Sequence, residues 1–114
     1  MKIVVTEWIW PNGLKRLAEK ENELVYDPGL WNKPKLAREV EEADALIVRN
    51  QTPVDERLLR RARKLKVIGR LGVGLDNIDL AAAAERDIAV VSAKNANANA
   101  VAEYVIAAMF HACR

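Results

Sequence analysis

Residues 67–79 read VIGRLGVGLDNID, which is an apolar run followed by a glycine-rich turn and a helix start. The run Val67-Ile68-Gly69 is typical of a buried strand, and the glycines after it permit a tight turn. Asp76-Asn77-Ile78-Asp79 then supplies residues that cap helices, so we expect a helix from here to about Glu85. A strand, a turn and a helix in this order form one unit of an α/β fold.

The same strand-and-helix unit repeats on both sides of this stretch. Upstream, Thr52-Pro53-Val54-Asp55 has the pattern of a helix start, in which the Thr52 hydroxyl accepts from the backbone N–H of residue 55. Asn32 is the expected cap of an earlier helix, with Pro34 in its first turn. The expected strands are residues 3–5, 24–26, 45–48, 67–69 and 88–91. The expected helices are residues 11 to about 21, 32–43, 52–62, 76–85 and about 97–112.

This alternation predicts a parallel sheet that helices cover on both faces. Strands that are apolar throughout, such as 45–48, need cover on both faces, and helical crossovers imply parallel pairing. We therefore expect residues 1–114 to form a single domain, a doubly wound three-layer α/β/α sandwich. Its expected sheet has five strands in the flavodoxin-like order 2-1-3-4-5, the common solution at this size.

Composition and charge set several classes of function aside. The formal net charge of +2 gives no reason to expect a nucleic acid or an anionic membrane as partner. The basic residues between Arg57 and Arg70 have no interleaved aromatic and are expected on a solvated helix face. No apolar run approaches the roughly 18 residues that span a bilayer. The single cysteine, Cys113, fits a reducing compartment, so we expect the cytoplasm. His111 is the only histidine, and we expect no metal site.

In sheets of this kind, ligands bind at the carboxyl ends of the strands, which here lead into residues 6–12, 49–52, 71–77 and 92–97. Gly72-Val73-Gly74 is the most informative of these loops, since glycine lets the backbone approach a ligand and direct its N–H groups outward. With the N-terminus of a helix close by, a small carboxylate or phosphate would be stabilised there. The alternative is that the glycines only permit a tight turn.

Polar and aromatic side chains are further candidates at this edge. Arg49 and Asn50 follow the third strand and could face an anion beside the glycine turn. Alternatively, Asn50 serves the turn and Arg49 is solvated. Trp8 and Trp10 follow the first strand, where they could form the wall of a pocket, cover the end of the core, or contact another domain.

The glycine turn does not complete a dinucleotide-binding fingerprint. Asn77 stands where the third glycine of G-x-G-x-x-G belongs, and no acidic residue ends the next strand to bind a ribose. We therefore expect no NAD site in this chain. Thr6-Glu7-Trp8 is neither the phosphate loop of an FMN flavodoxin nor the acidic pair of a phospho-receiver, and Arg49 stands where a receiver has aspartate.

Three segments of the chain resemble the D-isomer-specific 2-hydroxyacid dehydrogenases, of the D-3-phosphoglycerate dehydrogenase type. They are ALIVRNQTPV at residues 45–54, LKVIGRLGVGLDNID at residues 65–79 and VAEY at residues 101–104. The resemblance extends from about Asp44 to Phe110. It implies a flavodoxin-like substrate-binding domain for a small 2-hydroxy or 2-oxo acid.

The resemblance also assigns site residues. It implies that the backbone N–H groups of Val73 and Gly74, in the turn that Gly72 opens, hold the substrate carboxylate. It places the family's strand-end polar pair on Arg49 and Asn50, and a further binding residue at Asn97. The chain departs from the family pattern at Lys94-Asn95, where Pro-Gly is common, and at Tyr104, where histidine is common.

In the family, the chain continues into an NAD-binding Rossmann domain with the nucleotide fingerprint and the catalytic arginine, glutamate and histidine. Hydride transfer needs a bound nicotinamide and a group that exchanges the alcohol proton. We therefore expect a truncated or engineered substrate-binding half with no catalytic residue, no cofactor in this chain and no turnover alone. One alternative is a stand-alone small-anion-binding or scaffold module. Another is a subunit that needs a separate NAD-binding domain.

The expected last helix, at about 97–112, is apolar nearly all round, as helices that become buried are. The resemblance implies that it packs in the nucleotide domain, near the subunit interface. Without that domain we expect it either to fold back over the fifth strand or to exchange with a second chain, which would give a homodimer.

Overall fold

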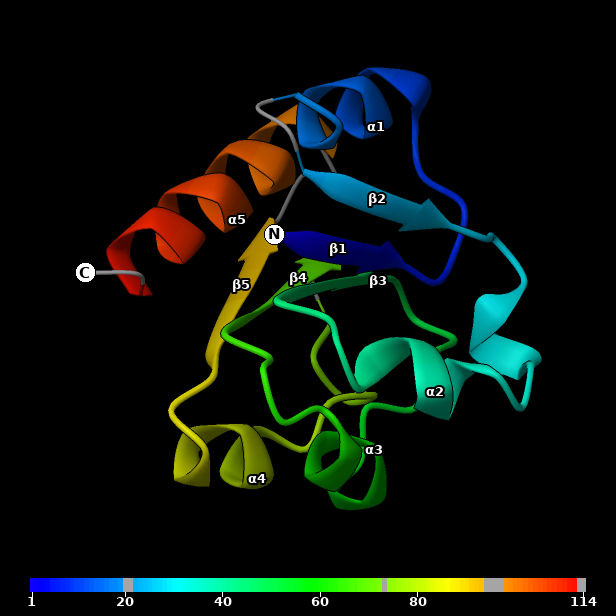
Figure 1. The fold of residues 1–114 in the computed structure, drawn as a ribbon, viewed down its shortest axis with the longest axis vertical. Coiled ribbons are helices and arrows are strands. Elements are labelled where there is room, and N and C mark those ends of the chain that lie inside the picture. The colour runs from blue at the N-terminus through cyan, green and yellow to red at the C-terminus, as the bar shows by residue number, and fades with distance from the viewer. Residues whose placement is uncertain (20–21, 73, 94–97, 113–114) are drawn as a thin grey trace.

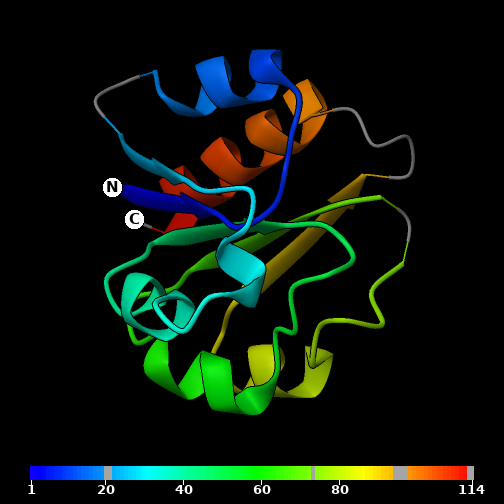
Figure 2. The same cartoon turned by 90° about the vertical axis from the view of Figure 1, so that its right-hand side faces the viewer.

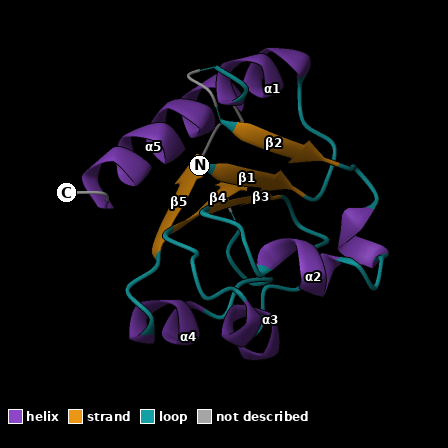
Figure 3. Ribbon diagram, viewed as in Figure 1, coloured by secondary structure: helices purple, strands orange, loops and turns teal. Residues whose placement is uncertain are grey.

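The computed structural model describes residues 1–19, 22–72, 74–93 and 98–112 (Figure 1). The strands are β1 (Lys2–Val5), β2 (Glu23–Tyr26), β3 (Ala45–Val48), β4 (Val67–Leu71) and β5 (Ala89–Ala93). The helices are α1 (Pro11–Leu17), α2 (Leu36–Val40), α3 (Glu56–Arg61), α4 (Leu80–Glu85) and α5 (Ala98–Ala112), with a short 3-10 helix, η1 (Leu30–Asn32). Strands and helices alternate along the chain as the sequence predicts (Figure 3).

The described strands form one parallel sheet in the order β2-β1-β3-β4-β5. Figure 2 shows α1 and α5 on one face of this sheet and α2, α3 and α4 on the other. The prediction of a flavodoxin-like, three-layer α/β/α sandwich is therefore confirmed. Because all pairs are parallel, the carboxyl ends of the strands lie along one edge, which we call the carboxyl edge.

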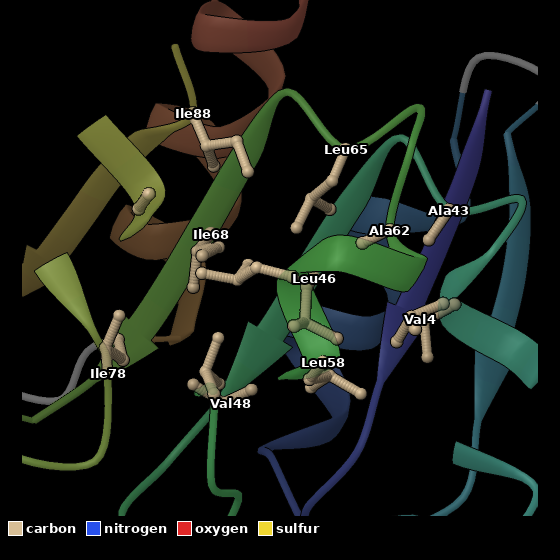
Figure 4. Close-up of a cluster of buried hydrophobic side chains, with 14 of the residues drawn as sticks. Val4, Ala43, Leu46, Val48, Leu58, Ala62, Leu65, Ile68, Ile78 and Ile88 are labelled. Atoms are coloured by element: carbon tan, nitrogen blue, oxygen red, sulfur yellow. The ribbon is translucent and has the colours of Figure 1, made fainter. Parts of the chain in front are cut away.

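Consecutive residues of the central strands face opposite sides of the sheet, so each side has its own hydrophobic core. Leu46 of β3 and Ile68 of β4 pack with Leu58 of α3 in the core beneath α2, α3 and α4 (Figure 4). The neighbouring residues Ile47 and Val67 belong to the core beneath α1 and α5. Every residue of β3 and β4 is buried, which explains why their sequences are apolar with little alternation.

The last helix, α5, folds back onto the sheet of its own chain. It packs against β4, β5 and α1, and Val101, Ala102 and Val105 are buried in the core that it covers. An ion pair between Arg16 of α1 and Glu103 of α5 joins the two helices at the surface. This arrangement corresponds to the fold-back alternative, and exchange of the helix with a second chain stays a prediction.

The predicted start of α3 at Thr52 is wrong. Asp55 caps the helix instead, and its Oδ1 accepts from the N–H of Leu58 at 2.8 Å. The hydroxyl of Thr52 is buried and hydrogen-bonds to Glu7 at 2.7 Å. The helix begins late because Val54 forms a parallel β-bridge with Ile78, which keeps the chain extended up to Asp55.

The same bridge delays α4, so its predicted start at Asp76 is also wrong. The N–H of Val54 donates to the carbonyl of Asn77 and the N–H of Asp79 donates to the carbonyl of Val54, both at 2.8 Å. Residues on either side of Ile78 are therefore held in an extended conformation. The helix begins at Leu80, with the Asp79 carboxylate accepting from the N–H of Ala82 at 3.0 Å.

Two earlier helices are shorter than predicted. The helix expected to reach about residue 21 ends at Leu17, where the side-chain amide of Asn22 donates to the Leu17 carbonyl at 3.2 Å. Asn32 belongs to η1 and does not cap α2. Lys33 is extended, with ψ 142°, as residues before proline usually are, so α2 begins only after Pro34.

Candidate functional site

The carboxyl edge gathers the loops that follow β1, β3 and β4. Val48 pairs with Arg70 in the register of β3 and β4, so residues from 49 onward and from 71 onward leave the sheet side by side. Of the predicted site residues, Arg49 and Asn50 follow β3, and Gly72 and Gly74 follow β4. The other two, Val73 and Asn97, lie outside the described residues.

The glycine turn wraps closely over the side chain of Arg70. Gly72 has φ +108°, which L side chains rarely adopt, and a β-carbon there would collide with Arg70 Nη1. A β-carbon at Gly74 would lie 2.8 Å from Oδ1 of Asp76 and 3.5 Å from Arg70 Nη2. Glycine is therefore required at residue 72 by its backbone conformation, whereas at residue 74 a side chain would only displace the exposed Asp76 carboxylate.

Arg70 is the basic residue that sequence reasoning misplaced. It lies in β4 with only 7% of its surface exposed, not on a solvated helix face. Its Nη1 donates to the Leu71 carbonyl at 2.7 Å, and its Nε donates to Oδ1 of Asn77 at 3.4 Å. Arg60 and Arg61 of α3 are exposed on a solvated helix face, as predicted. Both form surface ion pairs with carboxylates, as does Lys64, which lies after the helix.

Asn77 joins the glycine turn to the loop after β3. Its side-chain amide donates to the carbonyl of Arg49 at 2.7 Å and to the carbonyl of Thr52 at 2.8 Å. Its amide oxygen accepts from Arg70. This one side chain therefore fixes the two predicted halves of the site relative to each other, a role that the sequence did not reveal.

The guanidinium of Arg49 lies over two tryptophan rings. Its Cζ is 5.5 Å from the ring centre of Trp10 and 6.0 Å from that of Trp8, distances at which a cation is attracted to an aromatic face. Nη1 of Arg49 also donates to the backbone carbonyl of Trp8 at 3.3 Å. The tryptophans are 47% and 41% exposed, while Ile9 between them is buried. Asn50 is exposed.

Glu7 is the third residue, after Arg70 and Asn77, whose role the sequence did not reveal. It is 4% exposed, and its carboxylate accepts hydrogen bonds from the loop after β3. Oε2 accepts from the N–H of Arg49 at 2.6 Å and from the N–H and hydroxyl of Thr52 at 3.1 and 2.7 Å. Oε1 accepts from the N–H of Gln51 at 3.1 Å. The loop is thus wrapped around a buried anion of the chain itself.

Two hollows open at this edge among the described residues that form it. One, of about 260 Å³, lies beside Arg49 and is lined by Glu7, Trp8, Pro28, Arg49, Asn50 and Gln51. The other, of about 370 Å³, is lined by residues of both helix starts, including Asp55, Asp76 and Asp79. The second hollow has three carboxylates, which repel an anion. The first has one, Glu7, whose charge is met by four hydrogen-bond donors, and it has the positive charge of Arg49.

The predicted contribution of a helix N-terminus to the glycine turn is not found. The helix that follows the turn, α4, begins only at Leu80, because the bridge between Val54 and Ile78 intervenes. Any anion at the turn would therefore depend on backbone N–H groups and on the positive charge of Arg70.

The glycine turn does not have the arrangement of a dinucleotide-binding turn. A dinucleotide turn places the pyrophosphate on the first turn of a helix that directly follows the glycines. Here an extended bridge follows them, and Asn77, at the position of the third glycine, uses its side chain to hold the loop after β3. No helix within residues 1–19, 22–72, 74–93 and 98–112 is long and apolar enough to span a membrane.

A five-stranded parallel sheet in the order β2-β1-β3-β4-β5, with helices on both faces, defines the class of the flavodoxin-like α/β sandwiches. The sequence pattern of one family, described as D-isomer specific 2-hydroxyacid dehydrogenase, catalytic domain, matches residues 3–109. The chain belongs to this family.

Individual relatives agree with this assignment. The chain is 40% identical over all 114 residues to D-3-phosphoglycerate dehydrogenase of Archaeoglobus fulgidus, and 58% identical over 66 residues, 58% of the chain, to (S)-sulfolactate dehydrogenase of Chromohalobacter salexigens. It spans 21% of the length of each, so it corresponds to about a fifth of these relatives. The crystal structure of an NAD+-bound 3-phosphoglycerate dehydrogenase from Entamoeba histolytica matches with a TM-score of 0.70 and 32% identity, over 81% of this chain and 32% of that one.

Proposed function

We propose that this chain is a substrate-binding part of an NAD-dependent D-2-hydroxyacid dehydrogenase, and that its Gly72–Gly74 turn binds the carboxylate of a small 2-hydroxy or 2-oxo acid. The observation that carries the proposal is the buried guanidinium of Arg70 beneath this turn, whose hydrogen-bond partners are neutral oxygens. A buried positive charge whose partners are neutral attracts an anion to the adjacent surface, because the surrounding protein screens it weakly.

The substrates in the names of two relatives indicate the class of substrate. Phosphoglycerate and sulfolactate, the substrates in their names, are both 2-hydroxy carboxylates with a second anionic group on the neighbouring carbon. We propose that the turn takes the carboxylate and that Arg49 and Asn50 face the second group. The hollow beside Arg49 and Asn50, of about 260 Å³, supports only the second part of this assignment, because it has room for the second anionic group and the glycine turn does not line it.

The proposal assigns binding, and not redox chemistry, to these residues. Hydride transfer needs a bound nicotinamide and an acid or base at the substrate hydroxyl. The residues of the carboxyl edge hold and orient the acid, and the bound nicotinamide and the acid or base would come from outside residues 1–114. We accordingly propose that the 114-residue chain does not oxidise a hydroxy acid by itself.

A titration followed by nitrogen-proton correlation NMR tests the proposal. With 3-phospho-D-glycerate we expect the amide signals of Gly72 and Gly74 to shift in a saturable way, with weaker binding of D-lactate, which lacks the second anion. Gly74→Leu should abolish the shifts, because its side chain fills the turn, while Gly29→Ala, a glycine with ordinary van der Waals space around its α-carbon, should leave them unchanged.

An absorbance assay for NADH provides the second part of the test. We expect no NADH from the chain with NAD and a hydroxy acid, and activity only after a separate NAD-binding domain is added if the chain acts as a subunit. Shifts confined to other surfaces, or NADH formation by the chain alone, would contradict the proposed function. A Gly74→Leu variant whose remaining amide signals are dispersed as in the wild type would show that loss of binding is not loss of fold.

A further inference from the structure

Arg49 is held at the carboxyl edge by three separate contacts. Its backbone N–H donates to the Glu7 carboxylate at 2.6 Å, and its carbonyl accepts from the Asn77 side chain at 2.7 Å. Its guanidinium donates to the Trp8 carbonyl at 3.3 Å while lying over the tryptophan rings. Two of these three contacts come from residues 7–10, the short segment that follows β1.

The Glu7 carboxylate fixes the main chain of the loop that carries Arg49. A buried carboxylate is tolerated only when donors surround it, and Glu7 has four, three backbone N–H groups and one hydroxyl. These donors belong to Arg49, Gln51 and Thr52. The loop after β3 therefore directs all of them inward, toward the Glu7 carboxylate. Thr6 completes the arrangement, since its hydroxyl lies 2.7 Å from that of Thr52.

The tryptophans fix the side chain. Trp8 and Trp10 meet edge to face, with ring centres 4.9 Å apart, so each limits the motion of the other. Both remain nearly half exposed, so part of each ring lies open beside Arg49 at the surface. An arginine side chain has several rotatable bonds, and stacking on two mutually packed rings restricts it to few conformations.

We propose that Glu7, Trp8 and Trp10 form a positioning segment for Arg49, which orders its guanidinium in advance for the second anionic group of the substrate. Glu7 sets the path of the backbone and the two rings set the direction of the side chain. The part of this inference that concerns the substrate rests on the proposed function. The ordering of Arg49 itself does not, and it is measurable without a ligand.

The test begins with the ligand-free 114-residue chain. Protons of a side chain over an aromatic ring are shifted by the ring current, so we expect the Arg49 side-chain signals, identified by their loss in Arg49→Lys, to lie away from those of solvated arginines. Trp10→Leu should return them to the solvated position, and Trp10→Phe should restore part of the shift, because phenylalanine offers a weaker aromatic face. Tyr104→Leu, which removes an exposed aromatic residue on α5, is the matched control and should leave them unmoved.

The second measurement is the affinity for 3-phospho-D-glycerate. In Trp10→Leu we expect the dissociation constant to rise about two- to tenfold, the cost of ordering one long side chain on binding. D-lactate, which has no second anion, should bind Trp10→Leu as it binds the wild type. Glu7→Gln should weaken the phosphorylated acid in the same selective way.

Several results would overturn the inference. Arg49 signals at the solvated position in the wild type, or unmoved in Trp10→Leu, would show that the rings do not order the side chain. Unchanged or tighter binding of the phosphorylated acid by Trp10→Leu would show that the stacking does not prepare Arg49 for a ligand. If the wild type binds neither acid, the proposed function fails, and the Arg49 signals alone then decide whether the segment orders this residue.

Discussion

The backbone of Gly69 on β4 runs directly beneath Val105 of α5, so that a β-carbon at residue 69 would lie 2.7 Å from Val105 Cγ2. The same β-carbon would be 2.9 Å from Ile47 Cδ1 and 3.0 Å from Val101 Cγ1. Glycine at this position therefore sets how closely the last helix approaches the sheet.

Gly69→Ala should lower the free energy of unfolding by about 1–3 kcal/mol, the usual cost of overpacking a filled core. Urea denaturation measures this as a lower midpoint with an unchanged slope. Because the obstruction is the side chain of Val105, the double variant Gly69→Ala with Val105→Ala should lose less stability than the sum of the two single variants.

The control for this prediction is Gly29→Ala, where the nearest atoms to an added β-carbon are 3.7 Å away. We expect its stability to be unchanged or slightly higher than that of the wild type. Additive effects of Gly69→Ala and Val105→Ala would show that the two residues do not share the contact.

The helix caps provide a prediction that separates the structure from the sequence pattern. Asp55→Ala and Asp79→Ala should each cost about 0.5–2 kcal/mol of stability, since each carboxylate accepts from a backbone N–H in the first turn of its helix. Asp76→Ala, at the cap position that the sequence suggested, should change stability by less than about 0.5 kcal/mol. A larger loss for Asp76→Ala than for Asp79→Ala, in the same denaturation assay, would place the start of α4 where the sequence pattern had it.

The reason that the architecture could be predicted, and the helix starts could not, lies in the range of the interactions. Apolar runs and crossover lengths are local properties, and they are sufficient to predict a parallel sheet with helices on both faces. The starts of α3 and α4 depend on the bridge between Val54 and Ile78, which pairs two loops far apart in sequence. No local pattern around Thr52 or Asp76 indicates that bridge.

The candidate site shows the same division. Its location at the carboxyl edge follows from strand direction, so Arg49, Asn50, Gly72 and Gly74 could be named in advance. Arg70 could not, because the basic residues before it are exposed, and its burial depends on the register of β4 against β3. Asn77 was missed because its acceptors lie 25 and 28 residues away.

Glu7 can be tested by removing its charge at constant shape. Glu7→Gln should cost about 1–3 kcal/mol of stability, because the amide nitrogen cannot accept from the N–H groups that converge on the carboxylate. Thermal or urea unfolding measures the loss. Glu56→Gln, which alters an exposed ion pair with Arg60, is the matched control and should stay within about 0.5 kcal/mol. If Glu7→Gln and Glu56→Gln lowered stability equally, the hydrogen bonds to the buried Glu7 carboxylate would stabilise the fold no more than the exposed ion pair of Glu56 does.

The turn after β2 predicts how acid acts on one carboxylate. The Lys33 ammonium donates to Asp27 at 2.7 Å and the N–H of Gly29 donates to it at 3.0 Å, and these contacts lower the pKa of Asp27 below its ordinary value. In the unfolded chain the pKa of an aspartate is about 3.9. Because the pKa of Asp27 is lower in the folded state, these contacts stabilise the fold at pH values above about 3.9. The contribution is lost as the pH falls through the lower folded pKa. Lys33→Met should therefore raise the pKa of Asp27 in a carbon-detected carboxyl titration and weaken the dependence of stability on pH in the acid range.

The control is Lys15→Met, a change at an exposed lysine of α1, which should leave the pKa of Asp27 where it is. If Lys33→Met did not change the pKa of Asp27, Lys33 would not be the cause of the lowered value.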